Sequence, residues 1–249
     1  MAFFFSFDYA DPAVSIPRLT HIGAGAVALF AGLVPILGRK GGALHRRAGR
    51  VYVGAMIIVA LTALVLTALL PLTGGRLFLT GIAFLSFYLS FTGWRAARRR
   101  VRSVGKQFLP KQFKLFGQKL FGLAPLDTAL ALGTLLVGLL MVGAGLYWRD
   151  LLFSFFGGLI LLFAGRDAYS AFRATPPGQP EPWVFRHISR MGGSYITTFT
   201  AFLVVNLGHW LPASAPGWLD TAGWIVPSLI GTLLIRRAIR TYSLKLKRA

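Results

Sequence analysis

Long apolar runs alternate with short basic segments along the whole chain. A helix needs about 20 mostly apolar residues to cross the hydrocarbon of a bilayer, and seven runs approach or reach that length. They cover residues 19–37, 51–70, 77–94, 126–147, 151–171, 188–211 and 218–235. The pattern therefore predicts an all-α integral membrane protein, a bundle of about seven transmembrane helices that forms a single domain over residues 1–249.

Lysine and arginine lie almost entirely on one side of these predicted spans. That side holds 24 of the 27 basic residues, and the other side holds 3. Because cytoplasmic loops carry the excess of basic residues, we expect the N-terminus outside and the C-terminus in the cytoplasm. Outside the spans, the pattern predicts an outer interfacial segment over residues 1–18, a cytoplasmic amphipathic helix over 106–122 and a basic cytoplasmic tail over 236–249.

Composition narrows the class of protein further. The net charge of +20 comes from basic residues between apolar spans, so the expected partner is a bilayer with anionic head groups and not a nucleic acid. The chain has no cysteine and only seven acidic residues, which excludes thiolate metal sites and argues against hard-cation sites. The expected location is the inner (plasma) membrane of a cell, with several passes.

Short side chains and carboxylates give local predictions about helix starts and packing. A carboxylate at the start of a helix offsets the positive end of the helix dipole, and three aspartates begin predicted spans. They are Asp127, Asp150 and Asp220. In the first span, small side chains recur every four residues and favour close helix packing. They are Ala24, Ala28 and Gly32.

A polar stripe runs along the sixth predicted span. Residues spaced three or four apart share one face of a helix, and here that face carries two histidines and other polar side chains. Its members are His187, Met191, Tyr195, Thr198, Phe202, Asn206 and His209. Polar groups are unfavourable in hydrocarbon, so we expect this face to point at other helices or at a bound group.

The four histidines divide into two near each side of the membrane. His21 and His209 are predicted at the outer side, and His45 and His187 at the cytoplasmic side. Arginines crowd the inner pair, where they would meet haem propionates or lipid phosphates. They are Arg46, Arg47, Arg186 and Arg190. The 22 residues from His187 to His209 make about 33 Å of helix, which separates the inner and outer pairs.

Two short motifs carry a resemblance to a known family. HRRAGRVY contains His45, Arg46, Gly49 and Tyr52, and HISRMGGSY contains His187, Met191 and Tyr195. Together with the earlier His21, they resemble a bacterial family of uncharacterised multi-pass membrane proteins, over roughly residues 17–210. The resemblance implies a membrane fold and says nothing about activity. In related sequences an aromatic residue often precedes the methionine, where this chain has Arg190.

Three functions stay open on these observations. The arrangement of the histidines is similar to that in transmembrane cytochromes b, which implies haem b bound by paired histidines and electron transfer with a quinone or a membrane protein partner. Alternatively, the cytoplasmic arginines and histidines bind a lipid or a small anion. The third alternative is an accessory or structural subunit of a larger membrane complex. No catalytic residues are identified.

Overall fold

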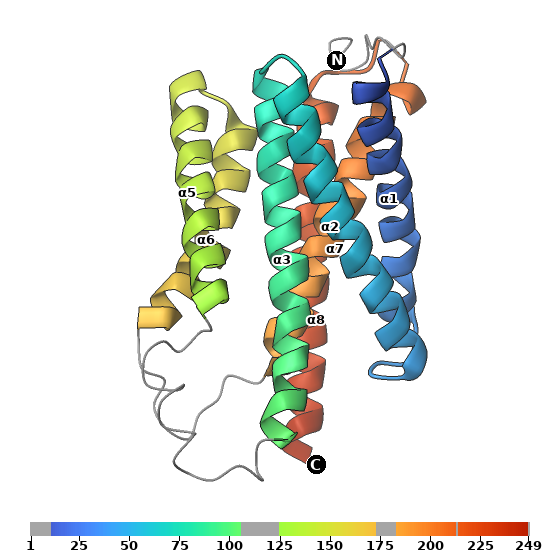
Figure 1. The fold of residues 1–249 in the computed structure, drawn as a ribbon, viewed down its shortest axis with the longest axis vertical. Helices are drawn as coiled ribbons and strands as arrows, with labels where there is room; N and C mark the ends of the chain where they lie inside the picture. Colours follow the sequence, from blue (N-terminus) through green and yellow to red (C-terminus); the bar gives the residue numbers. More distant parts are fainter. Residues whose placement is uncertain (1–10, 106–124, 173–182, 213, 249) are drawn as a thin grey trace. The chain divides into compact units, whose positions relative to one another are not determined.

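The structure is a computed structural model that describes residues 11–105, 125–172, 183–212 and 214–248. Seven α-helices account for the regular structure of these ranges, which confirms the all-α prediction (Figure 1). They are α1 (Pro12–Leu37), α2 (Ala43–Leu69), α3 (Gly74–Gly105), α5 (Pro125–Trp148), α6 (Leu151–Phe172), α7 (Trp183–Trp210) and α8 (Trp218–Arg248). Residues 12–18 of the predicted interfacial segment form the first turns of α1. The predicted amphipathic helix at 106–122 lies outside the described residues.

Six of these helices are long and apolar enough to span a membrane. They are α1, α2, α3, α5, α6 and α8. The seventh, α7, has 28 residues and is not among these six. Large apolar side chains such as Phe30, Leu37 and Leu146 are exposed on the candidate spans, as lipid contact requires. The chain is therefore a multi-pass membrane protein.

Helix ends follow from local sequence signals. α1 begins after Asp11, whose carboxylate accepts the N–H of Ala13 at 2.8 Å. After its last turn, the Nζ of Lys40 donates to the carbonyls of Pro35 and Ile36. Partial burial at that position lowers the pKa of Lys40. The side chain of Asp150 accepts the N–H groups of residues 152 and 153 at 2.8 and 3.2 Å, which confirms it as a helix-start residue.

The chain divides into two compact units. The first comprises residues 1–90 and 192–237, and the second comprises residues 91–191 and 238–249. Residues of α3, α7 and α8 therefore contribute to both units. We describe each unit by itself, and the single domain expected from the sequence stays a prediction.

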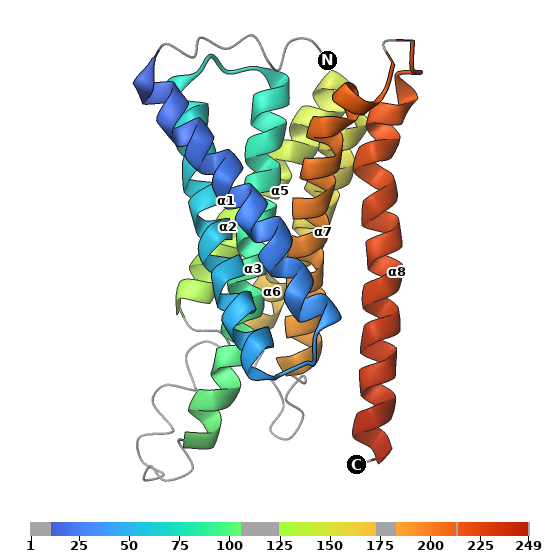
Figure 2. The same ribbon diagram turned by 90° about the vertical axis from the view of Figure 1, so that its right-hand side faces the viewer.

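In the first unit, α1 packs against α2 (Figure 2). The small side chains predicted to favour close packing, Ala24, Ala28 and Gly32, are the buried residues of α1. A Cβ atom at Gly32 would overlap the ring of Tyr195. Tyr195 belongs to α7, so the close approach of α1 to α7 depends on glycine at that position.

In the second unit, α5 and α6 form an antiparallel hairpin (Figure 1). Arg149 in the tight turn has φ of 53°, the left-handed conformation that few non-glycine residues adopt. The N–H of Asp150 donates to the carbonyl of Gly145 at 2.8 Å and closes the turn. A Cβ at Gly157 would lie 2.8 Å from the backbone nitrogen of Val142, so glycine also sets the distance between these two helices.

Candidate functional site

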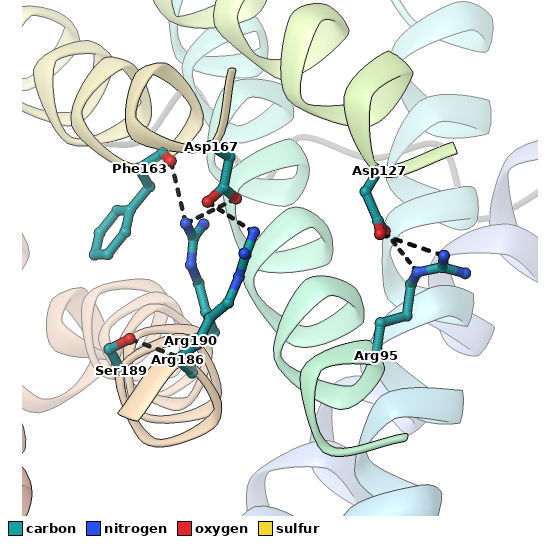
Figure 3. A network of polar contacts seen from close by, with 7 residues as sticks. All are labelled: Arg95, Asp127, Phe163, Asp167, Arg186, Ser189 and Arg190. Atoms are coloured by element: carbon teal, nitrogen blue, oxygen red, sulfur yellow. Dashed lines mark hydrogen bonds and ion pairs between the residues drawn. The ribbon is translucent and has the colours of Figure 1, made fainter. Parts of the chain in front are cut away.

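Three arginines and two aspartates from four helices form ion pairs in the second unit (Figure 3). We call this group the ion-pair cluster. Its members are Arg95 of α3, Asp127 of α5, Asp167 of α6, and Arg186 and Arg190 of α7. Charged groups removed from water need partners, so such a cluster links the helices that supply it.

Arg95 and Asp127 form a two-pronged ion pair. The Nε of Arg95 lies 2.6 Å from Oδ1 of Asp127, and its Nη2 lies 3.3 Å from Oδ2. This side-by-side geometry is the strong form of the arginine–carboxylate contact. Asp127 lies in the first turn of α5, as predicted, but it is only 5% exposed. The sequence predicts the helix-start role and does not reveal the link to α3.

Asp167 is shared by two arginines. Its Oδ1 lies 2.8 Å from Nη2 of Arg186, and its Oδ2 lies 2.8 Å from Nη2 of Arg190. Arg190 also donates to the carbonyl of Phe163 at 3.1 Å and stacks over the ring of that residue at 5.0 Å. The side chain of Arg190 is 5% exposed and that of Arg186 is 20% exposed. Arg190 is therefore the fixed partner of Asp167, and Arg186 is the accessible one.

A small, partly open hollow, with room for about one water molecule, adjoins the cluster. Its lining residues are Thr92, Arg95, Ala96, Asp127 and Arg186. A guanidinium group carries five N–H donors, and one carboxylate engages about two of them. Arg95 and Arg186 both line the hollow, so an anion bound there would lie beside both residues.

His187 lies beside this cluster on α7. Its Nδ1 lies 3.0 Å from the carbonyl oxygen of Gly93, and its ring is 6.3 Å from that of Trp183. A carbonyl only accepts hydrogen bonds, so Nδ1 carries the hydrogen. In the neutral ring, Nε2 then carries the lone pair that binds a proton or a metal.

The other three histidines lie in the first unit. The Nδ1 of His21 bonds the hydroxyl of Thr62 at 2.9 Å, which links α1 to α2. His45 is half-buried in the first turn of α2, and His209 is exposed in the last turn of α7. Within the ranges that the structure describes, no three or more histidine, aspartate or glutamate side chains gather as metal ligands.

The four arginines predicted to crowd the inner histidines divide between the units. Arg46 and Arg47 are exposed at the start of α2 in the first unit, where Arg46 donates to the carbonyl of Gly41 at 2.6 Å. Arg186 and Arg190 belong to the ion-pair cluster of the second unit. In the second unit, these arginines meet a carboxylate that the sequence had not paired with them.

The polar stripe of α7 meets other helices near its middle. The hydroxyl of Tyr195 donates to the carbonyl of Leu29 on α1 at 3.2 Å, and Thr198 lies 3.2 Å from the hydroxyl of Tyr52 on α2. Toward the C-terminal end of the helix, Asn206 donates to the carbonyl of Phe202 on its own helix at 2.7 Å. Met191 is half-buried in the second unit.

A second polar face of α7 is more deeply buried and is missing from the sequence analysis. Arg190, Ser194 and Thr197 each precede a stripe residue by one position, which turns them about 100° around the helix. In the first unit, Ser194 lies 2.7 Å from the hydroxyl of Tyr52, and Thr197 lies 2.7 Å from that of Ser86. We call Tyr52, Ser86, Ser194 and Thr197 the hydroxyl cluster. The spacing of small hydroxyl residues along α7 is the signal that would have indicated this face.

The hydrogens of the hydroxyl cluster can be assigned. Ser194 donates to the carbonyl of Ser86 at 3.2 Å, and Thr197 donates to the carbonyl of Ser194 at 2.8 Å. Tyr52 then donates to Ser194, and Ser86 donates to Thr197, because each acceptor has already used its own hydrogen. Both chains of donors end at backbone carbonyls. The cluster is therefore a closed connection among α2, α3 and α7, not an open path for protons.

Comparison with known proteins finds one family. Residues 18–109 match the family described as predicted membrane protein (DUF2306). The predicted resemblance to an uncharacterised membrane protein family is confirmed over these residues. The match covers less than half of the chain, including His21 and HRRAGRVY but not HISRMGGSY. No curated protein and no solved structure matches the chain.

Proposed function

We propose that this multi-pass membrane protein binds the anionic head group of an amphiphile, a lipid phosphodiester, at the hollow between Arg95 and Arg186. The observation that carries the proposal is the hollow itself, which two arginine residues line from different helices. Arginine is the side chain best suited to bind phosphate through paired N–H groups. Among the five residues of the cluster, three guanidinium groups face two carboxylates, so an added anion is electrostatically favoured.

The position of the hollow along the helices favours an amphiphile over a soluble ion. Arg95 lies near the end of the candidate span Gly74–Arg98, and Asp127 is the second residue of the span Leu126–Trp148. Lipid phosphates lie at this level, where apolar helix surface gives way to polar residues. In the predicted orientation, this is the cytoplasmic side of the membrane.

Binding of short-chain phosphatidylglycerol to the full chain in zwitterionic detergent tests the proposal. Arg95→Gln and Arg186→Gln should each weaken binding roughly tenfold, the value of one charge-assisted hydrogen bond. The matched control is Arg98→Gln, because Arg98 lies on the same helix as Arg95 and stacks over Trp94 at 4.5 Å. An equal loss of binding in Arg98→Gln would show that the effect comes from the overall positive charge and not from this site. Equally tight binding of dimethyl phosphate would identify the ligand as a soluble anion and would contradict the proposal that it is an amphiphile.

A second candidate function is haem binding and membrane electron transfer through the histidines. The hydrogen bond from His187 to the carbonyl of Gly93 favours it, since haem and metal ligands in proteins commonly donate their second ring nitrogen in this way. His187 would be the residue of the second unit that holds the haem iron, since it is the sole histidine of that unit. Bound haem would supply one-electron transfer.

An absorption spectrum of the chain, expressed with haem supplied, separates the two candidates. Haem binding through His187 predicts a Soret band that His187→Ala removes. His21→Ala and His209→Ala should lose the same band together if that pair binds haem. A colourless preparation would end the haem candidate and leave the phosphodiester site untouched.

A further inference from the structure

We propose that Arg186 exchanges Asp167 for the bound anion, while Arg190 keeps Asp167 neutralised. This inference rests on the proposed phosphodiester site and adds its regulation. It makes Asp167 an internal competitor of the ligand, and Arg190 a positioning residue that never contacts it.

The two arginines hold different oxygens of the same carboxylate (Figure 3). Arg186 contacts Oδ1 and Arg190 contacts Oδ2, each at 2.8 Å. Because the contacts do not overlap, Arg186 can leave while the contact of Arg190 stays intact. A carboxylate with one arginine partner is still an ion pair, so the exchange strands no buried charge.

The surroundings of the two arginines decide which one moves. Arg190 is held by three groups: Asp167, the carbonyl of Phe163 and the ring of Phe163. Arg186 lines the hollow and is the more exposed of the two. Displacing Arg190 would break contacts in a buried site, whereas Arg186 needs only to turn toward the hollow that it already lines.

Charge counting indicates why a singly charged anion suits this exchange. Before binding, the carboxylate of Asp167 serves both Arg186 and Arg190. After binding, each guanidinium of the cluster has one negative partner: Arg95 has Asp127, Arg190 has Asp167, and Arg186 has the ligand. A phosphodiester carries that single charge.

Competition predicts that removing the internal carboxylate strengthens binding. With Asp167→Asn, short-chain phosphatidylglycerol should bind roughly tenfold more tightly, because Arg186 no longer has to leave a charged partner. The control is Asp150→Asn, which removes the same charge from the opposite end of α6. This control should leave binding within about twofold of the unaltered chain, an effect well below that of one hydrogen bond.

A double variant keeps the test decisive if Asp167→Asn does not fold. Asp167→Asn with Arg190→Gln removes both members of the buried pair, and it should also bind more tightly than the unaltered chain. Weaker or unchanged binding by both variants, with Arg186→Gln still deficient, would overturn the exchange and leave the phosphodiester site standing. Unchanged binding in Arg95→Gln and Arg186→Gln would instead remove the site itself.

Discussion

The two units hold their helices together with different chemistry. The hydroxyl cluster of the first unit is neutral. Its hydroxyl groups are joined by hydrogen bonds, and the last donor of each chain bonds a backbone carbonyl. The ion-pair cluster of the second unit is charged, and its guanidinium groups outnumber its carboxylates. In the neutral network, the hydroxyl hydrogens are already used in hydrogen bonds within the protein. In the charged network, the excess of guanidinium groups over carboxylates favours binding of an anion. Only the second therefore suits binding.

The largest expected effect concerns the side of the membrane on which the ion-pair cluster lies, because the outcome is all or none. The asymmetry of 24 to 3 basic residues predicts that a reporter fused after Ala249 is cytoplasmic and that one inserted at Ser214 is not. Activity of compartment-specific reporters measures this. Both reporters on one side would contradict the seven-span topology and the cytoplasmic location of the cluster.

Removal of one buried charge should be the most damaging substitution. Arg190→Gln removes the buried arginine partner of Asp167 and the hydrogen bond to the carbonyl of Phe163, and it should lower the free energy of unfolding by about 3 kcal/mol. The double variant Asp167→Asn with Arg190→Gln should lose less, because no carboxylate is then left with a missing partner. Chemical unfolding in detergent measures both. A double variant less stable than Arg190→Gln would mean that the pair itself, and not the uncompensated charge, supplies the stability.

Close packing in the first unit should respond next. Gly32→Ala would force a methyl group into the ring of Tyr195 and should lower the free energy of unfolding by about 2 kcal/mol. Gly25→Ala is the matched control on the same helix, because a Cβ there has no described neighbour within 4 Å. Alanine favours the helix over glycine, so Gly25→Ala should lose no stability. Equal losses in the two variants would show that contact with the ring of Tyr195 is not the cause.

The smallest effect is expected in the hydroxyl cluster. Tyr52→Phe removes hydrogen bonds to Ser194 and Thr198 and should lower the free energy of unfolding by about 1 kcal/mol or less. Tyr147→Phe is the control, because that side chain is 84% exposed. Phosphatidylglycerol binding should be unchanged in both variants. Weaker binding in Tyr52→Phe would show that the two clusters are coupled.

The helices themselves could be predicted from the sequence. The seven expected spans correspond to the seven helices of the described residues, six of which are long and apolar enough to span a membrane. The agreement follows because the length of an apolar run and the residues at its ends act locally. Asp150 caps its own helix, and the four-residue spacing of Ala24, Ala28 and Gly32 places them on one face of α1; the structure confirms both. These features depend on neighbours three or four positions away.

The partners of the polar residues were decided by tertiary structure. The spacing along α7 indicated a stripe through Tyr195 and Thr198, but the deeper face lies one residue earlier, through Arg190, Ser194 and Thr197. Likewise, the sequence predicts only a helix-start role for Asp127, and the structure adds the ion pair with Arg95 of α3. A helix with polar groups on adjacent faces can be buried on either face. Which face is buried depends on the side chains of other helices, and those are far away in the sequence.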